Sequence, residues 1–194
     1  MHSAAILTGG RAVRFAGGDK SALIVDGRPI LERQIAELTQ ITSDILIVGG
    51  HPPARAIRGA RSVADRVPGC GPLGGLHAAL TDALGDATFV VACDMPYLSA
   101  ALIRYMLALT GDADGVVPRT EDGYHPLCAA YTRACIEPIA RRLADGRLKM
   151  TDLFDDLRVR IVTAEEIDAF GDRRRLLANV NTPAEYSSIE ANKI

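Results

Sequence analysis

Short apolar runs alternate along this chain with segments in which apolar residues return every three or four positions. The runs are brief and bounded by Gly, Asp or Pro, which is typical of strands buried on both faces of a sheet. They cover residues 4–8, 45–48, 62–64, 88–92 and 115–118. This alternation predicts an α/β fold: a doubly wound, mostly parallel sheet with helices on both faces, in a single domain over residues 1–194.

Helical periodicity is clearest in three segments that follow predicted strands. Pro29 suits the first turn of a helix, and apolar residues then recur at spacings of four and three, at Leu31, Ile35 and Leu38. A second apolar stripe is formed by Leu73, Leu76, Ala79, Leu80, Ala83 and Leu84. Ser99 is expected to cap a third helix, because a serine hydroxyl can accept a hydrogen bond from a first-turn amide.

The second half of the chain continues the pattern. Residues 125–131 alternate less clearly and are interpreted as an antiparallel strand. A helix over 133–143, a strand over 158–162 and a closing helix over 183–189 complete the predicted order. In open sheets of this kind ligands bind at the carboxyl ends of the strands, so the segments that follow the strands are the candidate site.

The composition argues against several classes of protein. The 194 residues are 48% hydrophobic and 24% charged, and the net charge of −2 leaves no basic excess for binding nucleic acid. No apolar run reaches the roughly 20 residues that span a bilayer, and the first residues lack the pattern of a secretory signal. The four cysteines are irregularly spaced, which favours buried thiols in a cytoplasmic enzyme over a zinc site or disulfides.

A glycine-rich loop follows the first predicted strand, with the sequence L-T-G-G-R-A-V-R-F-A-G-G-D-K over residues 7–20. Glycines let backbone amides approach a phosphate closely, and Arg14 and Lys20 can neutralise its charge. The loop is not a Walker A motif, because Asp19 separates Gly18 from Lys20. The interpretation is a phosphate-binding loop; the alternative is a flexible surface loop with a solvated cluster of charges.

The same loop resembles L-[AT]-G-G-x-x-x-R-[MF]-x-G-x-D-K, the signature of the MobA-type nucleotidyltransferases that make molybdenum cofactor dinucleotides. Four further segments resemble motifs of that family: Asp65 followed by G-P-L-G-G-L at 71–76, C-D-M-P-Y-L at 93–98, H-P-L at 125–127 and N-V-N-T-P at 179–183. The resemblance spans nearly the whole chain. One departure is Gly49-Gly50, where some members carry an asparagine that contacts the nucleotide.

The resemblance implies a Rossmann-like nucleotidyltransferase fold and a reaction. GMP would be transferred from GTP to the terminal phosphate of Mo-molybdopterin, and pyrophosphate released. Candidate partners are proteins that deliver the cofactor and proteins that take part in the maturation of molybdoenzymes. Nucleic acid and membranes are not expected as partners. The residues assigned to nucleotide binding are Leu7, Thr8, Gly9, Gly10, Lys20, Asp65 and Asp94. Lys20, Arg14 and Asp94 are assigned to catalysis.

Two aspartates fall at the carboxyl ends of different predicted strands, on the same edge as the glycine loop. Carboxylates together with phosphate oxygens suit Mg²⁺, which takes only one or two protein ligands in such sites. Asp94 is therefore the predicted Mg²⁺ ligand, and the resemblance places Asp65 beside the nucleotide. The alternative is that either aspartate merely caps the helix or turn that follows it.

The pterin substrate is assigned to Asn179, Asn181 and His125. The side chains of an N-x-N pair in extended backbone point to the same face, and each amide offers the donors and the acceptor that suit a pterin edge. The alternative for the asparagines is a helix-entry turn in which Asn181 or Thr182 caps. The alternative for His125 is a hydrogen-bonded histidine within a strand.

Other functions remain open to the sequence alone. Residues 69–74 match G-x-G-x-x-G, the spacing of a nicotinamide dinucleotide site, although Pro72 removes one amide that a pyrophosphate would use. The same fold also serves cytidylyl- and sugar-1-phosphate nucleotidyltransferases. A non-catalytic module that binds GTP and carries the cofactor is the third alternative.

Overall fold

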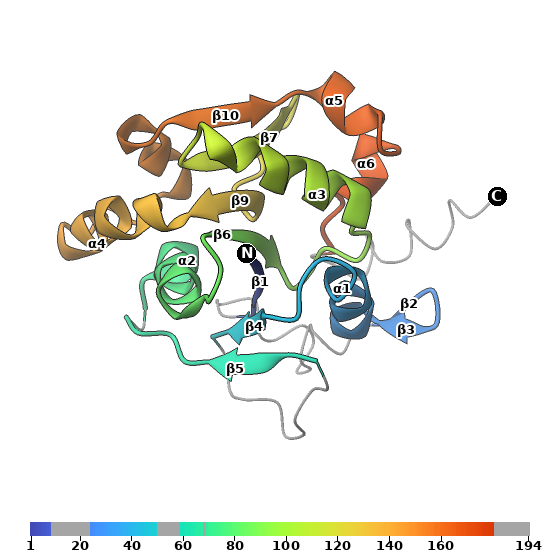
Figure 1. Ribbon diagram of the computed structural model, residues 1–194, viewed down its shortest axis with the longest axis horizontal. Helices are drawn as coiled ribbons and strands as arrows, with labels where there is room; N and C mark the ends of the chain where they lie inside the picture. Colours follow the sequence, from blue (N-terminus) through green and yellow to red (C-terminus); the bar gives the residue numbers. More distant parts are fainter. Residues whose placement is uncertain (9–23, 50–58, 68, 181–194) are drawn as a thin grey trace.

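The computed structural model describes residues 1–8, 24–49, 59–67 and 69–180 of the chain. Its centre is a sheet that reaches across the molecule (Figure 1). In spatial order the strands are β10 (Val159–Val162), β7 (Gly115–Thr120), β9 (Cys128–Thr132), β6 (Ala87–Ala92), β1 (His2–Leu7), β4 (Ile45–Val48) and β5 (Arg61–Val63).

The strands of this sheet run parallel to their neighbours wherever β9 and β8 are not involved. β9 is antiparallel to both β6 and β7, and β8 (Gly123–Tyr124) forms an antiparallel pair with β7. A separate hairpin joins β2 (Ile24–Val25) to β3 (Arg28–Pro29). The mostly parallel, doubly wound sheet is confirmed, and so is the antiparallel strand expected near residues 125–131.

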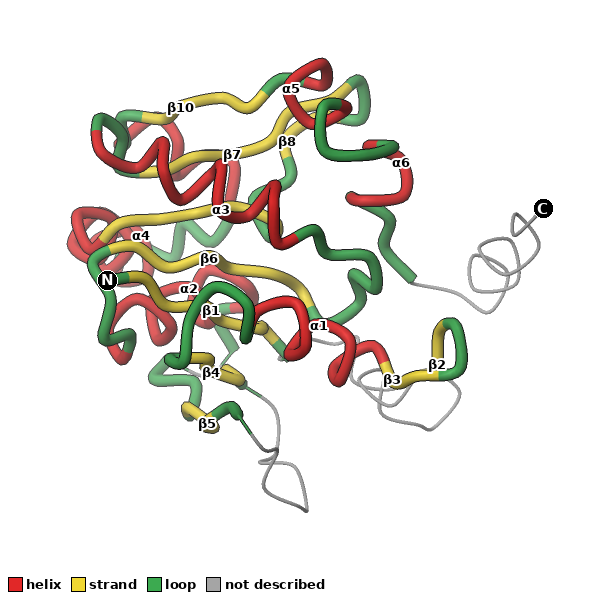
Figure 2. The backbone as a smooth tube through the Cα atoms, turned by 45° about the vertical axis from the view of Figure 1, so that its right-hand side comes forward, coloured by secondary structure: helices red, strands yellow, loops and turns green. Residues whose placement is uncertain are grey.

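Helices cover both faces of the sheet (Figures 1 and 2). One face carries α1 (Ile30–Leu38), α3 (Ala100–Ala108) and α5 (Ala164–Asp168), and the other carries α2 (Gly71–Asp82) and α4 (Ile136–Ala144). Strand β1 shows why both faces need a cover: Ala4 and Ile6 pack into the first apolar cluster, Ala5 and Leu7 into the second. Alternate side chains of a strand point to opposite faces, so a wholly apolar strand is stable only between two helical layers.

Short elements complete the chain. They are the helix α6 (Arg173–Leu176) and the 3₁₀ helices η3 (Leu109–Gly111), η4 (Arg133–Cys135) and η5 (Met150–Asp156). The predicted cap of α3 is confirmed, because the Ser99 hydroxyl accepts a hydrogen bond of 3.3 Å from the Leu102 amide. The order of elements from η4 to β10 also agrees with the helix and the late strand expected there.

Three local predictions were wrong. β5 is exposed rather than buried on both faces, because it forms one edge of the sheet. Leu84 is 68% exposed, because α2 ends at Asp82, before the apolar stripe does. Pro29 occupies the cap position before α1 rather than its first turn. The helix expected at 183–189 lies outside the described residues.

Among the residues that the structure describes, no helix has both the length and the apolar composition needed to cross a bilayer.

Candidate active site

The carboxyl ends of β1, β4, β5 and β6 meet at one edge of the sheet. Leu7 is in register with Val48 of β4 on one side and with Ala92 of β6 on the other. Neighbouring strands lie about 4.8 Å apart, so the residues that follow these strands form a continuous row. Two sequence-predicted residues, Thr8 and Asp94, are thereby brought to adjacent places in that row.

Thr8 is fixed where the chain leaves β1. Its amide donates to the Val48 carbonyl at 2.9 Å, and its hydroxyl lies 2.8 Å from the Gly49 carbonyl. Leu7 is buried, and its carbonyl accepts a hydrogen bond of 3.1 Å from the Cys93 amide. The entry to the glycine-rich loop therefore has a defined direction, set by contacts to both neighbouring strands.

Asp65 sits in a turn between β5 and α2. Its Oδ1 atom accepts a hydrogen bond of 3.1 Å from the Val67 amide. Asp65 therefore caps this turn, as the alternative to nucleotide binding predicted. Gly74 packs directly beneath: a Cβ atom there would lie 3.3 Å from Asp65 Oδ1 and 3.1 Å from the Val67 carbonyl oxygen. The glycine of the G-P-L-G segment is thus explained by close packing against the Asp65 turn.

Asp94 follows β6 at the centre of the row, and its Oδ1 atom is buried. Two side-chain contacts hold the backbone around it: the Gln34 amide donates to the Ala92 carbonyl at 2.8 Å and to the Met95 carbonyl at 2.9 Å. Gln34 is fully buried on α1 and was not singled out from the sequence. The sequence did carry a signal for Gln34, because this polar residue lies within the apolar stripe of α1.

Asn179 is exposed and lies beside Asp94, because the amide of the next residue, Val180, donates to the Asp94 carbonyl at 2.8 Å. The structure therefore brings a C-terminal pterin candidate to the strand end that carries the predicted metal ligand. Val180 itself is fully buried, which anchors this contact.

His125 reaches the same edge because β9 runs antiparallel and begins there. Its Nε2 atom lies 2.9 Å from the Thr120 hydroxyl, and its amide donates to the Pro118 carbonyl at 2.9 Å. Burial lowers the pKa of His125 below its ordinary value of 6.5, although the charges of Asp122 and Glu121 oppose this. The imidazole is therefore neutral at pH 7. It is also hydrogen-bonded to Thr120, which agrees with the alternative in which His125 is a hydrogen-bonded structural residue.

The remaining predicted site residues cannot be placed in this way. Gly9, Gly10, Arg14, Lys20 and Asn181 lie outside the described residues. Their assigned roles stay predictions.

The donor set suits a nucleotide-bound cation rather than a closed protein cage. Within the described segments no three His, Cys, Asp or Glu side chains come together as a metal cluster. Mg²⁺ in nucleotide sites needs only one or two carboxylates, because phosphates and water complete its six ligands. Asp94 meets that requirement, and Asp65 lies at the end of another strand of the same edge.

The chain is similar to known proteins over most of its length. The family model of the MobA-like NTP transferase domain matches residues 4–160. A probable molybdenum cofactor guanylyltransferase of Pelotomaculum thermopropionicum is 37% identical, over 93% of this chain and 87% of that protein. A molybdenum cofactor guanylyltransferase of Desulfosudis oleivorans is 34% identical, over 96% of this chain and 93% of that protein.

Solved structures show the same fold. Molybdopterin-guanine dinucleotide biosynthesis protein A of Archaeoglobus fulgidus superposes with a TM-score of 0.81 at 22% identity, over 98% of this chain and 97% of that one. A 2-C-methyl-D-erythritol 4-phosphate cytidylyltransferase of Thermus thermophilus gives a TM-score of 0.69 at 16% identity, over 96% of both chains. With a family model and two relatives that span most of its length, the chain belongs to the MobA-like NTP transferase family.

Proposed function

We propose that this protein is a molybdenum cofactor guanylyltransferase, which transfers GMP from GTP to the terminal phosphate of Mo-molybdopterin and releases pyrophosphate. The observation that carries the proposal is the similarity, over more than nine-tenths of the chain, to two proteins that bear this name. The nicotinamide alternative loses its support, since close packing of Gly74 on the Asp65 turn accounts for the last glycine of the G-x-G-x-x-G match.

In this proposal the edge of the sheet has two sides. The nucleotide side consists of the carboxyl ends of β1, β4 and β5, with Thr8 and Asp65. The acceptor side consists of the ends of β6 and β7, the start of β9 and residues 177–180. Asp94 stands between them, which is where the two substrates of a transfer reaction must meet.

The chemistry needs little proton transfer. An oxygen of the acceptor phosphate attacks the α-phosphorus of GTP, the bond to the bridging oxygen of the β-phosphate breaks, and pyrophosphate leaves with that oxygen. The attacking phosphate monoester has a second pKa of about 6 and is mostly deprotonated at pH 7, so no general base is required. Catalysis then consists of alignment and neutralisation of charge.

Each side chain has a proposed task in that scheme. Lys20 and Arg14 offset the negative charge that grows on the α-phosphate and the departing pyrophosphate. Thr8 and the two glycines that follow it orient the nucleotide through their backbone. Asp65 contacts the nucleotide on the far side of that row.

Asp94 holds Mg²⁺ in this proposal. The ion, when bound, supplies positive charge against the phosphate oxygens, and the two half-buried carboxylates of the edge fit such a group.

The pterin lies on the acceptor side, against Asn179, Asn181 and His125. The position of Asn179 next to Asp94 supports this assignment, through the hydrogen bond of Val180. His125 contributes a neutral ring that orients a ligand and does not donate a proton at pH 7.

The proposed location of the protein is the cytoplasm, and its proposed partners include other proteins. A cytoplasmic location agrees with four free cysteines, two of them buried. Proteins that deliver molybdopterin and proteins that mature molybdoenzymes are the proposed macromolecular partners.

One experiment separates this function from its alternatives. The full chain is incubated with Mo-molybdopterin, Mg²⁺ and either GTP or CTP, and the products are measured by mass spectrometry. We expect molybdopterin guanine dinucleotide and pyrophosphate from GTP. A cytidylyl product would instead support the activity named for the Thermus structural neighbour, and bound but unconverted GTP would support the carrier alternative.

A further inference from the structure

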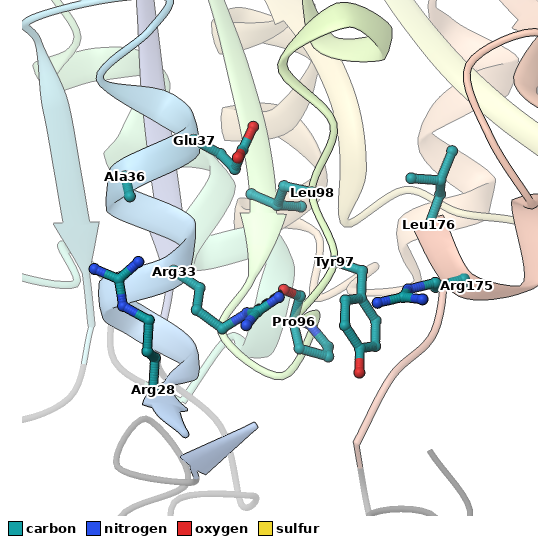
Figure 3. A pocket seen from close by; sticks show the side chains of 9 residues that line it. All are labelled: Arg28, Arg33, Ala36, Glu37, Pro96, Tyr97, Leu98, Arg175 and Leu176. Atoms are coloured by element: carbon teal, nitrogen blue, oxygen red, sulfur yellow. Dashed lines mark hydrogen bonds between the residues drawn. The ribbon is translucent and has the colours of Figure 1, made fainter. Parts of the chain in front are cut away.

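A basic pocket lies beside the acceptor side, between three segments that are far apart in the sequence. It has a volume of about 330 Å³ and is bounded by β3 and α1, by the loop after Asp94 and by α6 (Figure 3). Its principal side chains are Arg28, Arg33, Glu37, Tyr97 and Arg175. None of these residues has a role in the proposed function.

The pocket carries excess positive charge. Three arginines face two carboxylates: Glu37, which accepts a hydrogen bond of 3.3 Å from the Ala100 amide, and Asp26, which pairs with Arg33. Within the described part of the chain, no carboxylate lies within ion-pairing distance of Arg28 or Arg175. The contrast is Arg173, on the same short helix as Arg175, which pairs with both Asp168 and Glu121. The protein as a whole is weakly acidic, so this local excess is a departure from its surroundings.

Tyr97 forms a rigid wall for the pocket. Its ring is 8% exposed and lies between two guanidinium groups, with Arg175 4.4 Å and Arg33 5.3 Å from the ring centre (Figure 3). Arg33 is held in place, because it donates to the Pro96 carbonyl at 3.2 Å and pairs with Asp26 at 3.5 Å. Arg175 is exposed and is held by the ring alone among the contacts of the described residues. A cation stacked on an aromatic ring in this way loses little when it turns toward an anion.

The pocket is coupled to the reaction site by short backbone links. Tyr97 follows Asp94 by three positions, and Arg175 precedes Val180, whose amide is bonded to the Asp94 carbonyl. A ligand in the pocket therefore touches the two segments that carry Asp94 and Asn179.

We propose that this basic pocket is a second anion-binding subsite, which holds an anionic group of the acceptor molecule other than the phosphate that receives GMP. The side chain of Arg175 turns toward that group and binds it, and Tyr97 and Arg33 fix the position of the group. The assignment to the acceptor rests on the proposed function; the binding of an anion does not. Planar guanidinium donors match the oxygens of a compact anion, so Arg175 and Arg33 are suited to bind such a group.

The subsite is tested first with sulfate as the probe. The full chain is saturated with GTP and Mg²⁺, so that the proposed nucleotide site is filled, and the tyrosine ring signals are followed by NMR during titration. We expect the Tyr97 signal to shift and saturate, and the Arg175→Gln variant to bind sulfate about tenfold more weakly, since a charged donor is lost. The matched control is Arg119→Gln, because Arg119 also stacks on a tyrosine, 5.1 Å from the ring centre of Tyr124, but lies outside the pocket. A Tyr97 response that chloride at equal ionic strength reproduces, or that Arg175→Gln leaves intact, overturns the subsite.

The acceptor is tested with the same variants in steady-state kinetics. Arg175→Gln should raise the KM for Mo-molybdopterin about tenfold while the KM for GTP and the melting temperature stay near those of wild type. Arg175→Lys, which keeps the charge, should recover part of the loss. Sulfate binding with an unchanged acceptor KM overturns the assignment to the acceptor. If wild type transfers no GMP, the proposed function fails, and the sulfate titration still decides whether the subsite exists.

Discussion

The proposed nucleotide side and the proposed acceptor side of the sheet edge are held in place by different means. On the nucleotide side the contacts are local and run through the backbone: Thr8 donates to the carbonyls of Val48 and Gly49 at the end of β4, and Asp65 caps its own turn over Gly74. On the acceptor side, long side chains from another element hold the backbone: Gln34 and Arg33 of α1 donate hydrogen bonds to carbonyls at the end of β6 and in the loop after it. Substitutions should therefore damage the first side through backbone geometry and the second through lost side-chain contacts.

The largest effect is expected where the two sides meet. Asp94→Asn should lower turnover about 100- to 1000-fold, because the amide keeps the shape but loses the charge that is proposed to hold Mg²⁺. The melting temperature should stay near that of wild type. Turnover and melting are measured on the same preparation across a Mg²⁺ titration, and near-normal turnover at saturating Mg²⁺ would remove Asp94 from the metal site.

The second prediction sharpens the nucleotide side. Lys20→Arg should lower kcat or GTP affinity at least about tenfold, which corresponds to 1.4 kcal/mol. The chain uses lysine at only three positions among 22 basic residues, and arginine's planar fork is larger than a compact ammonium group. Steady-state kinetics measure the effect. Equal kinetic constants in the two proteins would mean that Lys20 contributes only diffuse charge.

The third prediction concerns the acceptor side. Replacing Asn179 and Asn181 together by Ala should weaken binding of molybdopterin and leave GTP affinity and thermal stability nearly unchanged. If the asparagines only cap the next helix, stability should fall by roughly 0.5–2 kcal/mol and molybdopterin affinity should not change. Isothermal calorimetry and thermal melting together tell these outcomes apart.

Gly74→Ala tests the backbone geometry of the nucleotide side. The added Cβ lies 3.1 Å from the Val67 carbonyl oxygen, so the Asp65 turn must shift. We expect a loss of stability of about 1–3 kcal/mol, as for other overpacked sites, with a raised KM for GTP and an unchanged acceptor KM. Gly111→Ala is the matched control, because nothing lies within 4 Å of a Cβ at that position. An unchanged KM for GTP would separate the turn from nucleotide binding.

The smallest effect belongs to His125. Its pKa is lowered in the folded protein by burial, so the unfolded chain takes up the proton first as the pH falls. This residue's contribution to stability is therefore present above about pH 6.5 and is lost as the pH drops through the folded value. Between about pH 7 and pH 5 the melting temperature of wild type should fall more than that of His125→Gln. Parallel melting curves for the two proteins would contradict the buried, neutral ring.

The sheet could be predicted because its central strands are apolar on both faces, and only a doubly covered sheet buries such strands. The same rule failed for β5, since the sequence does not show which strand lies at an edge. Asp94 was predicted as a site residue because strand ends are where ligands bind, and its role as a metal ligand stays a prediction. Gln34 and the Tyr97 pocket were not predicted, because the contacts that define them join residues that only the tertiary fold brings together. The single domain and the roles of the glycine loop stay predictions.

The hydrogen bond between Val180 and Asp94 has a consequence for synthesis of the protein. The three strands that end at the proposed nucleotide side, β1, β4 and β5, are complete by Val63, whereas the proposed acceptor side includes β9 and Val180, which come later in the sequence. Because a domain folds as a unit, a nascent chain should not hold Asp94 in its final position until residue 180 has been made. A molecule clipped before that residue should keep the strands of the nucleotide side and lose this link to the acceptor side.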